Sequence, residues 1–184
     1  SYDALLIATG ARIEAFSEHA TNVDDARMDE LLHGLAQDIE EGYTHTLAIV
    51  LPAPLPWPFP GYELALMASE RAYDMQSELD ITLLTPERMP LEVFGYQVSR
   101  SVSELLAERR IKVVTSAYCE IPQSQQVVVH PGGRTLHANR IVALPRRGRI
   151  DDQHRPVCNA ELVHHRECIG AVGCRSAGRD AEDV

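Results

Sequence analysis

The sequence has almost no lysine, no long apolar run and no pair of cysteines spaced as CxxC. Lys112 is the only lysine among the 184 residues, and the excess of acidic residues gives a formal net charge of −10. That charge repels phosphates and argues against nonspecific binding of nucleic acid. A membrane-spanning helix needs about 18 consecutive apolar residues. Because none is present, we expect no transmembrane segment.

The start of the sequence lacks the features of a secretory signal. Ser1-Tyr2-Asp3 has neither the basic region nor the apolar core of a signal peptide. The four cysteines, Cys119, Cys158, Cys168 and Cys174, are therefore expected as free thiols in the reducing cytoplasm. A strand begins directly after Ser1, so we also expect that an upstream part of the protein is missing.

The chain also lacks a glycine-rich loop where its pattern leads one to expect it. Residues 46–51 read as a buried strand, and a helix is predicted from Tyr62 to Gln76. This is the layout of the first βα unit of a dinucleotide-binding domain. Five alternating prolines, Pro52 to Pro60, stand in place of the glycines. Proline has no N–H group to donate, so this segment argues against NAD(P) bound in the usual mode.

Strands and helices alternate through the first two thirds of the chain. Apolar runs predict strands at 81–85 and 111–114, and helical periodicity predicts helices over 24–41 and 97–110. Asp24 or Asp25 is expected to cap the first helix and Gly42 to end it. The helix from Tyr62 is apolar on nearly all sides, which predicts that other elements cover it. The β-α-β-α-β order predicts an α/β fold with a parallel sheet.

Shorter strands are expected on either side of this region. Residues 118–121, 126–130 and 134–136 predict a small β-meander, with a turn at Pro131-Gly132-Gly133. Residues 139–145 read as a strand that leaves it. Near the N-terminus, the run Ala4 to Ala8 is typical of a strand buried on both faces of a parallel sheet.

Several of these segments resemble one protein family. Tyr2 to Ala11 is similar to the "YDxLxxATGA" segment of two-dinucleotide flavoproteins. Further matches are Tyr62-Glu63-Leu64-Ala65, Leu84-Thr85-Pro86-Glu87 and the strand 139–145, where Asn139 replaces a usual aspartate. In this order, they resemble the middle of an FAD- and NAD(P)-dependent pyridine nucleotide-disulphide oxidoreductase. The branch with sulphide:quinone oxidoreductases and type II NADH dehydrogenases is the most similar.

The resemblance implies a fold and a division into domains. It implies a three-layer, Rossmann-like parallel sheet with a small β-meander, plus part of a second, FAD-type domain. Residues 1–12 would end the first half of the FAD-type domain, and residues 13–116 would form the NAD(P)-binding-like domain. Residues 117–184 would hold the meander and an incomplete return to the FAD-type domain.

The resemblance also implies a function and its residues. Electrons would pass from a reduced donor, NAD(P)H or sulphide-like, through FAD to a quinone or similar acceptor. Glu63 matches the family's "G-x-E-L-A" glutamate and would be catalytic; in the first helical turn it would be stabilised by the helix dipole. The expected partners are these small molecules, and a homodimer is compatible with the family. The cofactor contacts would be Ala8, Thr9, Gly10, Pro52 and Cys174, the last in place of the flavin-binding aspartate of "VYAAGD".

Two other interpretations stay open. The FAD-type GxGxxG motif does not occur in this sequence, so the chain would be either an oxidoreductase fragment or a redox-inactive remnant that serves as a binding or dimerisation module. Cys158, His164 or His165, Cys168 and Cys174 are residue types that suit zinc. Their spacing matches no common zinc motif, and we predict no metal site.

Overall fold

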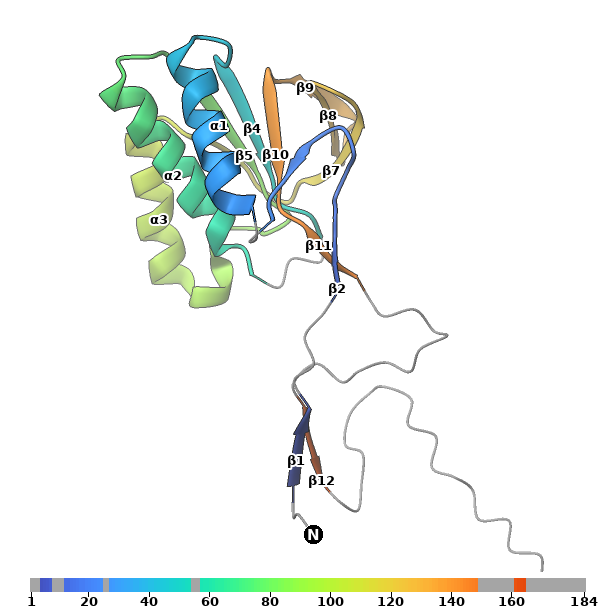
Figure 1. The fold of residues 1–184 in the computed structure, drawn as a ribbon. Helices are drawn as coiled ribbons and strands as arrows, with labels where there is room; N and C mark the ends of the chain where they lie inside the picture. Colours follow the sequence, from blue (N-terminus) through green and yellow to red (C-terminus); the bar gives the residue numbers. More distant parts are fainter. Residues whose placement is uncertain (1–3, 8–11, 25–26, 54–56, 149–160, 165–184) are drawn as a thin grey trace, which may run out of the picture. The chain divides into compact units, whose positions relative to one another are not determined.

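A computed structural model of the chain describes residues 4–7, 12–24, 27–53, 57–148 and 161–164. The chain divides into two compact units, one formed by residues 13–147 and the other by residues 1–12 with 148–184. The larger unit has three layers, with helices on one face of a parallel sheet and a β-meander on the other (Figure 1).

The middle layer is a five-stranded parallel sheet with the order β3-β10-β4-β5-β6. Ile49 lies opposite Leu83 on one side and Val142 on the other, so neighbouring apolar side chains line up across the sheet. Both faces of the central strands are buried, which explains their continuous apolar runs. The strands are β3 (Thr21–Asn22), β4 (Thr46–Val50), β5 (Asp80–Leu84), β6 (Lys112–Val114) and β10 (Arg140–Ala143).

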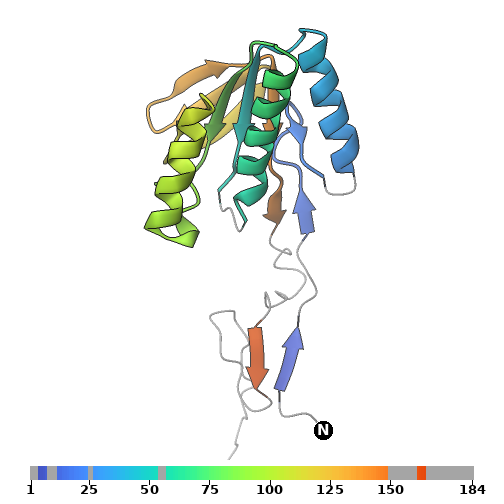
Figure 2. The same cartoon turned by 90° about the vertical axis from the view of Figure 1, so that its left-hand side faces the viewer.

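Three helices cover one face of this sheet (Figure 2). They are α1 (Met28–Glu40), α2 (Phe59–Asp74) and α3 (Tyr96–Glu108), with a short 3-10 helix, η2 (Glu92–Phe94), before α3. Leu35 and Ile39 of α1, Leu64 of α2 and Leu106 of α3 pack against strand residues in one apolar cluster. The parallel order and the helices between the strands confirm the predicted α/β fold.

The meander covers the opposite face. It consists of β7 (Tyr118–Gln123), β8 (Gln126–His130) and β9 (Arg134–His137), paired antiparallel. Val127 and Val129 of β8 pack against Ala48 and Val50 of β4. The turn between β8 and β9 contains Gly132 and Gly133 at positive φ. This confirms the predicted meander; β10, which follows it, enters the parallel sheet between β3 and β4, a position that the sequence pattern did not indicate.

The structure contradicts the predicted pairing of the first strand. β1 (Ala4–Ile7) pairs antiparallel with β12 (Glu161–His164) in a two-stranded sheet, whereas the sequence predicted a strand inside a parallel sheet. An apolar run indicates a buried strand, but it does not show whether the neighbouring strand runs parallel or antiparallel to it. A further short pair joins β2 (Arg12–Glu14) and β11 (Arg146–Gly148).

The ends of two helices also differ from expectation. α1 begins at Met28, and its N-cap is Arg27, without a side-chain cap; Gly42 at φ 74° follows its end as predicted. α2 begins at Phe59, three residues before the predicted start, because proline is tolerated in a first turn whose N–H groups need no partner. Its outer face is open, with Met67 48% and Tyr73 80% exposed, so other elements do not cover α2 on all sides.

Candidate functional site

A cluster of hydroxyl and carboxylate side chains lies near the carboxyl ends of β4 and β5. In open α/β sheets, ligands bind outside these strand ends, where the order of the strands reverses direction. The chain leaves β4 toward β5 and β6, while β10 and β3 lie on its other side, so the reversal falls beside β4. The N-terminus of α2 and the loop after β5 follow these two strand ends.

Tyr62, Thr85 and Glu87 form a hydrogen-bonded cluster there. The Tyr62 hydroxyl donates to Glu87 Oε2 at 2.7 Å, and the Thr85 hydroxyl donates to the same oxygen at 2.9 Å. Tyr62 is 2% exposed and Thr85 is fully buried. Burial raises the pKa of Tyr62 well above its usual range, and the bond to Glu87 adds to the shift. Tyr62 therefore stays protonated as a donor that fixes the Glu87 carboxylate.

The backbone around Glu87 is held by the end of β6 and by the residues that follow it. The Thr85 N–H donates to the Val114 carbonyl, and the Ala117 N–H donates to the Thr85 carbonyl. The Ser116 N–H donates to the carbonyl of Glu87 at 2.7 Å. The carboxylate thus has a fixed position at the sheet edge, where dinucleotide-binding folds place an acidic residue against a ribose.

The N-terminus of α2 offers few donors to a phosphate. Its N-cap is Pro58, and Pro60 occupies the first turn, so neither residue has an N–H group. The Gly61 N–H already donates to the Pro58 carbonyl at 3.1 Å. A pyrophosphate is normally held by free N–H groups at this point. The residues present do not fit the pyrophosphate of NAD(P) bound in the usual mode.

Gly61 nonetheless keeps one role of a dinucleotide-binding glycine. A Cβ at this position would lie 2.7 Å from Leu51 Cδ1 and 3.3 Å from Leu144 Cδ1. The absence of a side chain lets α2 approach the strand ends closely, as the third glycine of the usual loop does. Gly61 opens the matched "G-x-E-L-A" motif, but its close contact with the strand ends was not predicted from the sequence.

Aromatic residues connect α2 with the loop after β5. Trp57 packs edge-on against Phe94, with ring centroids 5.7 Å apart, and lies 6.2 Å from Phe59. All three stay open to solvent, with exposed fractions of 50%, 44% and 43% for Trp57, Phe94 and Phe59. We call Trp57, Phe59 and Phe94 the aromatic patch. The patch places apolar side chains where the usual fold has its glycine-rich loop.

The sequence-predicted site residues are placed as follows. Glu63 is exposed in the second turn of α2, not in the first turn as expected, because the helix begins earlier. Pro52 is buried directly after β4. Ala8, Thr9, Gly10 and Cys174 lie outside the described residues.

Only part of the predictions on cysteines and on a metal site falls within the described residues. Cys119 is the one cysteine within the described ranges, and burial raises its pKa to about 12, which leaves the thiol protonated and unreactive near neutral pH. Cys158, His165 and Cys168 lie outside those ranges. Among the residues that the structure describes, no three His, Cys, Asp or Glu side chains gather in a way that suits a metal ion.

The cluster of Tyr62, Thr85 and Glu87 was not predicted from the sequence. All three residues lie within the family-like segments, but no role was predicted for any of them. The available signal was an acidic residue close after a predicted strand, in the position that takes a ribose in dinucleotide-binding folds. The bond from Tyr62, 25 residues earlier in the chain, appears only in the tertiary structure.

No protein-family model matches the sequence, and no curated protein matches it. Solved structures do match in fold. The sulfide:quinone oxidoreductase from Aquifex aeolicus has 23% sequence identity and a TM-score of 0.64; the match covers 79% of this chain and 37% of that one. This chain has the pyridine nucleotide-disulphide oxidoreductase fold.

Two further structures share this fold. NDH2 from Plasmodium falciparum, solved in complex with RYL-552, has 18% identity and a TM-score of 0.59, covering 80% of this chain and 35% of that one. Putidaredoxin reductase, in covalent complex with putidaredoxin, has 20% identity and a TM-score of 0.54, covering 78% and 34%. The chain therefore spans about a third of the length of each of these structures.

In the part of the chain that the structure describes, no helix combines the length and apolar character that crossing a bilayer requires.

Proposed function

We propose that this chain is part of a flavin-dependent oxidoreductase. The observation that supports the proposal is the fold match between this three-layer chain and parts of a sulfide:quinone oxidoreductase and an NDH2. Electrons would pass from a reduced donor through FAD to a quinone or similar acceptor. The proposed site of action is the cytoplasm.

The donor is better described as sulphide-like than as NAD(P)H. Pro58 and Pro60 remove two phosphate-binding N–H groups, and the Gly61 N–H is already bonded. NADH added to the chain should therefore cause no saturable change in the fluorescence of Trp57, the single tryptophan. A saturable change would contradict this choice of donor.

The proposed residues divide into two groups. Ala8, Thr9, Gly10, Pro52 and Cys174 are proposed as cofactor contacts, on the family resemblance alone. Glu63 is proposed as the carboxylate that steers the donor or relays a proton, and its exposure on α2 leaves it free to exchange protons with solvent.

Flavin binding is the decisive test. The purified chain would be titrated with FAD and passed over a gel-filtration column, with and without a separate segment that carries the FAD-type GxGxxG motif supplied in trans. We expect flavin absorption to travel with the protein, and to be lost in Gly10→Val. Glu63→Gln should keep the flavin but slow its reduction and reoxidation.

The alternative function is a redox-inactive remnant that serves as a binding or dimerisation module. The aromatic patch favours it, because exposed aromatic side chains are enriched at protein interfaces. Absence of flavin binding, even with the GxGxxG segment supplied in trans, would rule out the oxidoreductase. Sedimentation of wild type and Trp57→Ala would then show whether the patch joins two copies.

A further inference from the structure

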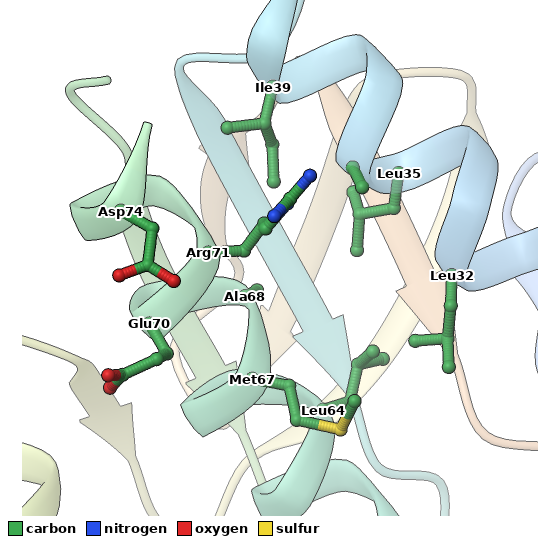
Figure 3. Close-up of a pocket in the computed structure, with 10 residues that line it drawn as sticks. Leu32, Leu35, Ile39, Leu64, Met67, Ala68, Glu70, Arg71 and Asp74 are labelled. Atoms are coloured by element: carbon green, nitrogen blue, oxygen red, sulfur yellow. The ribbon is translucent and has the colours of Figure 1, made fainter. Parts of the chain in front are cut away.

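A cleft with no role in the proposed site lies between α1 and α2, in the outer layer of helices (Figure 3). Its volume is about 360 Å³, which falls in the usual range of small-molecule sites. Apolar side chains from both helices line it: Leu32, Leu35, Ala36, Ile39, Leu64, Met67 and Ala68.

The cleft exists because small residues face it from both helices. Ala36 on α1 and Ala68 on α2 leave space that larger side chains at these positions would fill. Leu35 and Ile39 form part of its wall and are 3% and 1% exposed, so the wall belongs to the fixed core of the domain. Met67, at 48% exposed, is the flexible part of the rim.

One cationic side chain, that of the exposed residue Arg71, lies at the edge of this apolar space. The guanidinium of Arg71 extends from α2 toward α1, into the gap beside Leu35 and Ile39 (Figure 3). Within the described ranges, Arg71 makes no ion pair and no side-chain hydrogen bond. An Arg side chain carries five donors and no acceptor, so this one is ready for an anion.

The two carboxylates on the cleft's edge do not neutralise Arg71. Glu70 is paired with Arg109 of the segment after α3. Asp74 lies one turn further along α2, and Figure 3 shows both carboxylates pointing away from α1, opposite to the guanidinium. They do, however, repel a ligand with several negative charges, as does the net charge of −10.

We propose that the cleft binds an aliphatic monocarboxylate of medium chain length. Its carboxylate would accept a bidentate pair of hydrogen bonds from Arg71, and its hydrocarbon chain would lie along Leu32, Ala36 and Met67, the accessible apolar residues of the cleft. A single charge pairs with the guanidinium, and an apolar chain covers the partly exposed lining side chains of Leu32, Ala36 and Met67. This proposal does not depend on the flavin function.

The test is a calorimetric titration of the 184-residue chain with decanoate below its micelle concentration. We expect saturable one-to-one binding. Arg71→Met keeps most of the side-chain length without the charge and should weaken binding at least about tenfold, the loss expected when a charge-assisted bond is removed. Arg100→Met, on α3 and 68% exposed, is the matched control and should bind as wild type does.

Two further measurements separate the contributions. Ala36→Leu should fill the cleft and abolish binding, with an unchanged far-UV circular dichroism spectrum to show that the fold persists. Decyltrimethylammonium, with a similar tail and the opposite charge, should bind at least about tenfold more weakly than decanoate. Equal binding of the two amphiphiles, equal binding by Arg71→Met, or no decanoate binding to the wild type would each overturn the proposal.

Discussion

At the scale of single residues, Tyr62 is the clearest case of a side chain whose chemistry its surroundings decide. It is 2% exposed and donates to Glu87, a residue on a separate segment after β5. A phenol in water ionises near pH 10. In this setting its pKa is raised, first by burial and then by the bond to Glu87. The hydroxyl therefore fixes a carboxylate and does not act as an acid.

Tyr62→Phe should lower the free energy of unfolding by about 1–2 kcal/mol near neutral pH, because Glu87 loses a donor. The folded state binds the Tyr62 proton more tightly than the unfolded state. The stability that the Tyr62 hydroxyl contributes is therefore complete below about pH 10. It declines as the pH rises toward the raised pKa of Tyr62 in the folded state. Urea unfolding at several pH values should show the two proteins converging above pH ~10.

Tyr73→Phe is the control for this measurement, because Tyr73 is 80% exposed and on the same helix. It should track wild type at every pH. A constant gap between wild type and Tyr62→Phe up to strongly alkaline pH would contradict the assignment.

Asn139 joins the starts of two strands through a single oxygen. Its Oδ1 accepts from the N–H groups of His45 and Thr46, each at 3.1 Å, and from the Thr46 hydroxyl at 2.9 Å. Only an acceptor is required, so the structure explains how Asn139 can stand in place of the aspartate usual in the family it resembles.

Asn139→Ala should lower the free energy of unfolding by about 1–2 kcal/mol, because three donors lose their partner at a partly hydrated site. Asn139→Asp keeps the acceptor and should be as stable as wild type or more so. Chemical denaturation measures both. Equal losses in the two variants would show that the amide nitrogen of Asn139 matters.

At the scale of elements, the distance between α2 and the sheet depends on Gly61. Its substitution by alanine would place a Cβ 2.7 Å from Leu51 Cδ1, and Leu51 is only 1% exposed and held by its neighbours. We expect Gly61→Ala to destabilise the protein by about 1–3 kcal/mol, the usual cost of overpacking.

Gly34→Ala is the matched control, because Gly34 also lies in a helix, α1, but a Cβ added there would meet nothing within 4 Å apart from the backbone of its own helix. Removing a helical glycine at this position should stabilise by about 0.5–1 kcal/mol. Thermal unfolding of both variants measures the contrast, and a similar shift of the same sign in both would contradict the close approach of α2.

The loop after β5 is attached to the start of α2 by the aromatic patch as well as by the Tyr62–Glu87 bond. Phe94→Ala should remove the edge contact with Trp57 and shift the tryptophan emission to the red, because Trp57 becomes more hydrated. Val93→Ala, at a neighbouring residue that is 67% exposed, should leave the emission unchanged. Steady-state fluorescence reads Trp57 alone, since the chain has one tryptophan.

At the scale of the whole molecule, residues 13–147 contain both apolar clusters of the described chain. One cluster lies between the helices and the sheet, and the other lies between the sheet and the meander. A fragment of residues 13–147 should therefore fold by itself, with a single thermal transition. Its midpoint should lie within a few degrees of that of the full chain, which calorimetry can compare. A noncooperative transition would show that the ends supply part of the core.

The sequence by itself determined the layers of this domain. Continuous apolar runs such as 47–51 predicted central strands, helical periodicity in α1 predicted a one-sided helix, and Pro131-Gly132-Gly133 marked the turn of the meander. These features are local, since each depends on the spacing of apolar residues or on the backbone preference of a few residues. They therefore appear without knowledge of the partner segment.

Only the tertiary structure decided which segments these elements contact. It paired β1 antiparallel with β12, inserted β10 between β3 and β4, and brought Tyr62 to Glu87. It also left the cleft between α1 and α2 with Arg71 reaching across it. Strand direction, hydrogen bonds between distant residues and unfilled space all depend on how packed elements approach one another. A one-dimensional pattern records which faces are apolar, but not which surface each face will cover.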